Sequence, residues 1–369
     1  MRRICVAALL LLTCLSLTGT ALAAGAPELP EALTEQADLE GLERAARGQL
    51  GETSLTAGMS LEDGLLAILD RGGQAAQGAV RRAVGAAVKL LIVVLLCGLA
   101  EGMQMAGTEE GLPVVSVVGA LAVTALSLGE LNALVGMGRE AIDSMSLFSK
   151  TLLPTMATVV AASGAPMGGA VRQLATLMFS DVLLTLINRL LVPLIYLYVA
   201  ACTARAAVGN EGLKRLAAMI KSIVVTSLTI LLMAFIGYIT VSGVIAGSAD
   251  ALTVKAAKFT ISGMVPVVGG ILSDAAETVL AGAGILRDTV GVFGMLVVLS
   301  VCVVPFLTIG VQYLAYKVTA ALSATVGAGR VVDLIDNIGG AFALVLGMTG
   351  TCALILLVSL ISAISMVTP

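Results

Sequence analysis

Long apolar runs separated by short polar joints fill the chain from Val84 onward. Six runs reach the roughly 20 residues that a helix needs to cross a bilayer. They lie near 84–103, 114–136, 174–204, 223–247, 291–316 and 338–366. The pattern therefore predicts an all-α membrane protein with about six transmembrane helices. The third run would supply two half-length segments, and so a seventh span, if it were broken at Asn188-Arg189.

Two further stretches, 146–171 and 256–286, are short, rich in glycine and interrupted by charge. They favour short re-entrant or interfacial helices, because irregular backbone at membrane depth must be satisfied by protein or by a watery cavity. A proline within a span also kinks its helix and frees carbonyl groups. The candidate re-entrant and kink positions are Pro154, Pro193, Pro266, Gly269, Gly270 and Pro305.

The prolines also repeat at one spacing. Pro193 follows Pro154 by 39 residues, and Pro305 follows Pro266 by 39 residues. Each second proline lies in the middle of a span. The spacing predicts a parallel internal repeat, with copies at 146–247 and 256–366, related by an axis along the membrane normal. Coincidence among the nine prolines of the chain is the alternative.

The first 83 residues differ from the rest. Residues 1–23 have a basic start, an apolar core and the small-residue motif Ala21-Leu22-Ala23, which together predict a signal peptide. Residues 24–83 carry ten acidic residues and five arginines, and we expect an exported acidic amphipathic-helical segment. One of its helices should start near Ser60 and end at Gly72-Gly73. A polytopic helical membrane domain would then occupy 84–369.

Two charge signals bear on orientation. The short joint at 205–222 carries Arg205, Lys214, Arg215 and Lys221 and is the best cytoplasmic candidate. With six spans, this puts the mature N-terminus on the non-cytoplasmic side, as export by a signal peptide also requires. The basic residues near the start of the first span point the other way, and we follow the signal peptide.

Composition narrows the function. Charged residues make up 12% of the chain, about half the usual share in a soluble protein. The chain has no histidine, which excludes Ser-His-Asp and Cys-His catalysis and histidine-bearing zinc sites. We therefore expect no enzyme, no catalytic residues, no cofactor and no metal. A net charge of −3 does not favour nucleic acid as a partner.

Polar residues inside the spans are the candidate functional residues, because they are costly in lipid. Asp181 and Asn188 lie seven residues apart on one helix face, with Arg189 beside it, and could form either a polar path or an interhelical clamp. The clamp is the favoured interpretation. Small residues at four-residue spacing predict close helix packing in the last span; they are Gly339, Ala343 and Gly347. Four tyrosines toward the inner ends of two spans are expected to be interface anchors; they are Tyr196, Tyr198, Tyr313 and Tyr316.

One block of sequence is distinctive. Residues 259–275 read FTISGMVPVVGGILSDA, and Thr289-Val290-Gly291 follows. From about Leu90 to the C-terminus the chain resembles the stage III sporulation protein AE family of endospore-forming bacteria. The segment at 24–83 is not matched in detail.

The resemblance implies a large polytopic subunit of a secretion-like channel complex. That complex connects mother cell and forespore after engulfment and supports late forespore development. The implied location is the mother-cell-derived membrane around the forespore. The implied partners are other stage III sporulation A-operon membrane and ring proteins, and indirectly a cytoplasmic ATPase and a forespore-side ring partner. The alternative is a stand-alone secondary transporter or permease for a small solute, which the candidate repeat and Asp181, Asn188 and Arg189 support.

Overall fold

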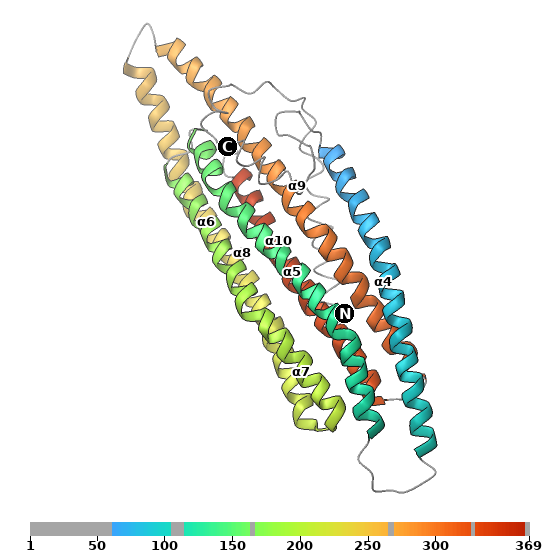
Figure 1. Ribbon diagram of the computed structural model, residues 1–369. Coiled ribbons are helices and arrows are strands. Elements are labelled where there is room, and N and C mark those ends of the chain that lie inside the picture. The colour runs from blue at the N-terminus through green and yellow to red at the C-terminus, as the bar shows by residue number, and fades with distance from the viewer. Residues whose placement is uncertain (1–60, 105–113, 163–166, 265–268, 326–328, 366–369) are drawn as a thin grey trace.

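The computed structural model describes residues 61–104, 114–162, 167–264, 269–325 and 329–365. Within these ranges the chain forms long helices that run side by side in alternating directions, and no strand occurs there (Figure 1). In chain order they are α4 (Leu61–Gln104), α5 (Val114–Ala162), α6 (Met167–Leu186), the π-helical turn η3 (Ile187–Leu191), α7 (Val192–Val208), α8 (Glu211–Met264), α9 (Gly269–Ser323) and α10 (Gly329–Ser365).

Six segments are long and apolar enough to cross a membrane, which confirms the predicted helical class and span number. They are Leu66–Gly102, Val114–Leu152, Met178–Val208, Glu211–Ser242, Val292–Ser323 and Gly329–Leu360. The alternative of a seventh span is wrong, because α6, η3 and α7 follow one another without a break and contribute one segment.

The two stretches expected as separate short helices take a different form. α5 continues unbroken through Pro154 to Ala162, and α6 begins at Met167. Likewise α8 continues to Met264, and α9 begins with Gly269 and Gly270; Pro266 lies outside the described residues. At 54 residues, α8 is about 81 Å long, far more than the roughly 30 Å hydrocarbon core. Apart from Lys150, which lies within Val114–Leu152, the described glycines and charges of these stretches belong to helix ends outside the six apolar segments.

The two mid-span prolines are accommodated differently. Proline has no N–H to donate, and its ring clashes with the carbonyl four residues earlier. The π-helical turn Ile187–Leu191 lies directly before Val192 and Pro193, where it interrupts the regular α-helical hydrogen bonding that a proline cannot complete. Pro305 lies inside the continuous α9. The internal repeat itself needs a superposition of its two copies and stays a prediction.

Gly72-Gly73 does not end the first helix, because α4 runs through it to Gln104. Glycine at position 72 instead lets α9 pack closely against α4, because a Cβ at Gly72 would lie 2.8 Å from Cγ1 of Val303 on α9. α4 also runs through the expected domain boundary at 83/84. The expected signal peptide and most of the exported segment lie outside the described residues.

The joint between α7 and α8 is a tight turn with identifiable caps. Gly209 adopts φ 77°, which a glycine tolerates, and its N–H donates to the carbonyl of Arg205 at 2.7 Å. The Asn210 side-chain oxygen accepts from the N–H of Gly212 at 2.7 Å and caps the start of α8. These caps allow the chain to reverse within two residues. The end of the bundle that carries this turn is called the lower end below, as it lies in Figure 1.

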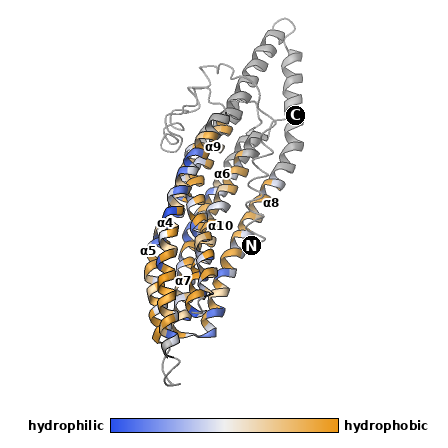
Figure 2. Ribbon diagram, turned by 90° about the vertical axis from the view of Figure 1, so that its right-hand side faces the viewer, coloured by the Kyte–Doolittle hydropathy of each residue, from blue (hydrophilic) through white to orange (hydrophobic). Residues whose placement is uncertain are grey.

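Burial is uneven around the bundle. In the apolar window of α10, 67% of the residues are buried, whereas in that of α8 only 17% are. Large apolar side chains are exposed on α4, α5 and α8, where lipid would cover them. Figure 2 shows hydrophobic residues along most of the described helices, with hydrophilic residues gathered at the lower end and along upper α4.

Candidate functional site

A polar cluster joins α5 to the α6–η3 segment. The Asn188 side-chain amide donates to Oδ1 of Asp143 at 2.6 Å. Asp181 accepts a hydrogen bond from the Ser146 hydroxyl and lies 3.4 Å from the Lys150 ammonium. Asp181 and Asn188 thus face the same neighbour, as their spacing predicts. We call these five residues the α5–α6 cluster.

The cluster has the geometry of an interhelical clamp. Asn188 is only 8% exposed, and every charged member has a partner on the facing helix. Interhelical hydrogen bonds of this kind stabilise membrane bundles by about 0.6 kcal/mol on average. Arg189 does not belong to it: its side chain is exposed and forms no ion pair with the described acids. Adjacent positions on a helix point about 100° apart, so Asn188 faces α5 whereas Arg189 points away from it. The expected set of Asp181, Asn188 and Arg189 therefore loses Arg189.

A shallow depression lies beside the cluster on α5. Its lining residues are Gly136, Arg139, Glu140, Asp143, Ser144 and Leu147. Asp143 belongs to both the depression and the cluster. The Asn188 carbonyl oxygen is buried and has no hydrogen-bond partner. The depression therefore adjoins the α5–α6 cluster through Asp143, while the Asn188 oxygen does not line it.

A second polar cluster was not anticipated. The Glu130 carboxylate on α5 accepts from the Gln312 amide at 2.6 Å and from the Tyr316 hydroxyl at 2.9 Å, both on α9. The Tyr316 hydroxyl also lies 3.0 Å from that of Ser127. The sequence holds a signal for this cluster: an acid inside an apolar run, and a Gln and a Tyr four apart on one helix face.

A third cluster joins α7, α9 and α10 near the lower end. Arg205 pairs with Asp333 at 3.0 Å, and Lys317 pairs with Asp336 at 2.6 Å. The Tyr198 hydroxyl donates to Asn337 at 3.3 Å. Since Tyr198 and Tyr316 are both buried and bonded to other helices, the expectation that they anchor the membrane interface is wrong.

Among the small residues predicted to allow close packing in the last span, Gly339 lies at a tight helix contact, whereas Gly347 is exposed and has room for a side chain. A Cβ at Gly339 would come within 3.2 Å of the Tyr316 Cβ, and one at Gly347 within 3.7 Å of Leu228. Ala343 is half-buried between them. Gly138 on α5 is tighter still, because a Cβ there would lie 2.9 Å from Val345 and 3.2 Å from Thr349 on α10.

Metal-binding side chains do not gather in the described part of the chain, where no three His, Cys, Asp or Glu residues come together. The described cysteines are buried and form no disulfide bond with one another. They are Cys97, Cys202, Cys302 and Cys352.

Six apolar helices held together by bonded polar side chains define a multi-pass helical membrane protein. The family model for Stage III sporulation protein AE matches residues 65–367, and the chain belongs to this family. Stage III sporulation protein AE of Bacillus subtilis (strain 168) is 27% identical over 252 residues, which cover 68% of this chain and 63% of that relative. The chain thus spans less than two thirds of the relative's length. No solved structure matches.

The family is named for a stage of sporulation and not for a catalysed reaction. The family match over residues 65–367 confirms the expected resemblance to this family.

Proposed function

We propose that the chain is a non-enzymatic subunit of a trans-envelope, secretion-like channel complex that connects mother cell and forespore during endospore formation. Membership of a sporulation family supports the developmental part of the proposal. The six apolar helices support a role within a membrane. In this role the chain supports late forespore development.

The observation that carries the proposal is how the interior polar groups are used. Glu130 bonds side chains of α9, Asp181 bonds side chains of α5, and Asp333 pairs with Arg205 of α7. These three acids thus join neighbouring helices through their bonded side chains. A scaffold needs such joints, whereas a solute path needs polar groups that face the solute.

The partners in this proposal are other stage III sporulation A-operon membrane and ring proteins, with a cytoplasmic ATPase and a forespore-side ring partner reached through them. The location is the mother-cell-derived membrane around the forespore, with the mature N-terminus on the non-cytoplasmic side. The basic residues at the lower end favour a cytoplasmic position for the α7–α8 turn.

Purification of the tagged chain from sporulating cells in mild detergent tests the proposal. We expect the chain to elute in a large particle together with other sporulation membrane proteins, and to transport no solute when reconstituted alone. Recovery of the chain by itself, with solute uptake in liposomes, would overturn the proposal.

A stand-alone transporter is the second candidate, and one observation favours it. The buried Asn188 oxygen without a partner lies at a π-helical turn, beside the depression that includes Asp143. π-helical turns are frequent at functional sites. The liposome uptake measurement above separates the two candidates.

A further inference from the structure

The middle of α5 has an outward side without large apolar side chains. Between Leu128 and Leu147, every exposed residue of this helix is small or polar. These residues are Gly129, Asn132, Ala133, Gly136, Arg139, Glu140 and Asp143. They occupy the same three positions of successive seven-residue repeats, so they lie on one side of the helix. Asp143 is bonded to Asn188, and we call the other six residues the α5 face.

The upper part of the α5 face lies near the middle of the spanning segments. A Cβ at Gly138, the residue before Arg139, would lie 2.9 Å from Val345 on α10 and 3.7 Å from Ile309 on α9. Val345 and Ile309 are close to the midpoints of the apolar segments to which they belong. A residue at the middle of a roughly 30 Å hydrocarbon core is about 15 Å from either interface. The exposed charges of Arg139 and Glu140 are therefore deep in the membrane domain.

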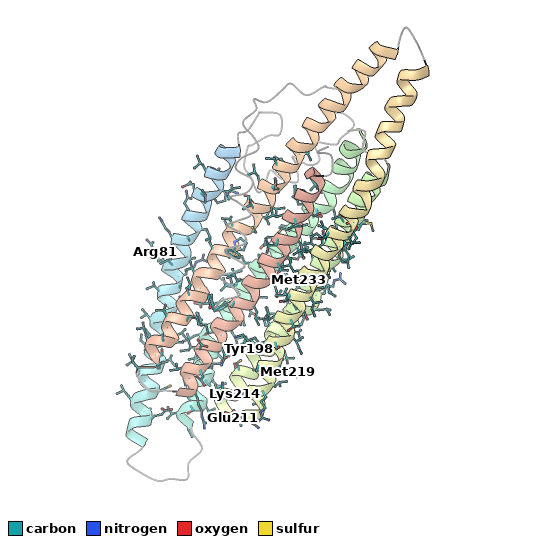
Figure 3. All side chains as sticks on the ribbon, turned by 180° about the vertical axis from the view of Figure 1, so that it is seen from behind. Arg81, Tyr198, Glu211, Lys214, Met219 and Met233 are labelled. Atoms are coloured by element: carbon teal, nitrogen blue, oxygen red, sulfur yellow. The ribbon has the colours of Figure 1, made fainter. Side chains whose placement is uncertain are left out.

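Lipid does not match this surface. Charged and amide side chains at such a depth need polar partners. Asn132, Arg139 and Glu140 have none within the described part of the chain. The outward side of α8 is the contrast: Met219 and Met233, which follow one another up that helix in Figure 3, are 54% and 64% exposed. Large apolar side chains of that kind suit lipid, whereas the α5 face needs another protein surface.

We propose that the α5 face binds the α5 face of a second copy of this chain, about a twofold axis along the membrane normal. Such an axis brings each residue next to its own equivalent, and one flank of the helix next to the opposite flank of its partner. Arg139 and Glu140 point about 100° apart, so each arginine meets the glutamate of the other copy. Asn132 can both donate to and accept from its equivalent. Gly129 and Gly136, with open space where a Cβ would lie, let the two helices approach closely.

The α5 face is thus complementary to itself in charge, in hydrogen bonding and in shape, which favours a second copy over a different protein. The contact does not depend on the proposed channel role, so either proposal can fail without the other. Two copies joined by one helix face should separate in dodecyl sulfate before either copy unfolds, so the free energy of unfolding of a single chain is a separate quantity.

Cysteine cross-linking of the full chain in lipid vesicles tests the contact. Gly136→Cys should form a disulfide-linked dimer on oxidation, whereas Ile230→Cys, the matched control on α8, should not. Ile230 is 60% exposed, and the nearby Leu228 lies beside Gly347 in the same α10 segment that adjoins Gly138. The unaltered chain gives the background from its own cysteines. Equal cross-linking at both positions, or none at either, would overturn the proposal. In membranes of sporulating cells, a Gly136→Cys product with another protein and none with itself would also overturn it.

Two charge variants then identify the paired residues. Arg139→Glu and Glu140→Arg should each weaken self-association by about tenfold or more, because two symmetric interhelical bonds are lost. Self-association is measured by energy transfer between labelled full chains in vesicles, over a range of lipid-to-protein ratios. A mixture of the two variants should associate about as tightly as the unaltered chain, since every acid then faces a base. A mixture that associates no more tightly than either variant alone would overturn the proposed pairing.

Discussion

Replacing Glu130 by leucine should weaken the contact between α5 and α9. The substitution removes the acceptor of two hydrogen bonds, from Gln312 at 2.6 Å and from Tyr316 at 2.9 Å. Tyr316 keeps its contact with Ser127, whereas no other partner of the Gln312 amide is seen among the described residues. Interhelical hydrogen bonds in membranes are worth about 0.6 kcal/mol on average and about 1.7 at most. We therefore expect a loss of about 1–3 kcal/mol in the free energy of unfolding.

The assay is unfolding of the purified chain in mixed micelles of mild detergent and dodecyl sulfate, followed by circular dichroism. Glu130→Gln keeps an acceptor oxygen and should lose less than about half as much as Glu130→Leu. Glu140→Leu is the matched control, since Glu140 is an exposed acid of the same helix, and it should change stability by less than about 0.5 kcal/mol.

A double-mutant cycle isolates the bond itself. The single variants Glu130→Leu and Gln312→Leu are compared with the variant that carries both. We expect a coupling free energy of about 0.6–1.7 kcal/mol between the two positions. A coupling within about 0.3 kcal/mol of zero would refute the argument that these polar groups hold the two helices together.

Two further predictions concern packing and topology. Gly138→Ala should cost about 1–3 kcal/mol, because its Cβ would press on two α10 side chains, whereas Gly136→Ala, with open space around it, should be neutral or slightly stabilising in the same unfolding assay. Cysteines placed at Asn210 and Thr325 should react with an impermeant thiol reagent from the same side of the membrane, because both turns follow helices that run toward the lower end; labelling from opposite sides would contradict the antiparallel order.

The span number and one face of the third span could be predicted from the sequence. Apolar length alone decides whether a segment can cross a bilayer, and helical periodicity alone puts Asp181 and Asn188 on one side. Which helix they would meet could not be predicted, because their partners Asp143 and Lys150 lie more than 30 residues earlier and are brought there only by the packing of α5.

Two predictions from single residues were wrong because a neighbouring helix changes the environment of the residue. Gly72 suggests a helix end by composition, yet its missing side chain serves the approach of α9. Tyr316 suggests an interface anchor by its distance from the span end, yet its hydroxyl finds Glu130 inside the bundle. In both cases the sequence shows a residue type that suits two environments, and only the neighbouring helix decides between them.

The central claim is that the polar groups inside the membrane domain join helices and do not form a path for solute. Asp181→Asn tests it most directly, since asparagine can still accept from the Ser146 hydroxyl while the charge is lost. The measurement is the heat-resistant spore count of a strain whose only copy carries this substitution, with the protein level determined in parallel. The account predicts normal protein and a near-normal spore count. Loss of sporulation at normal protein level would contradict it.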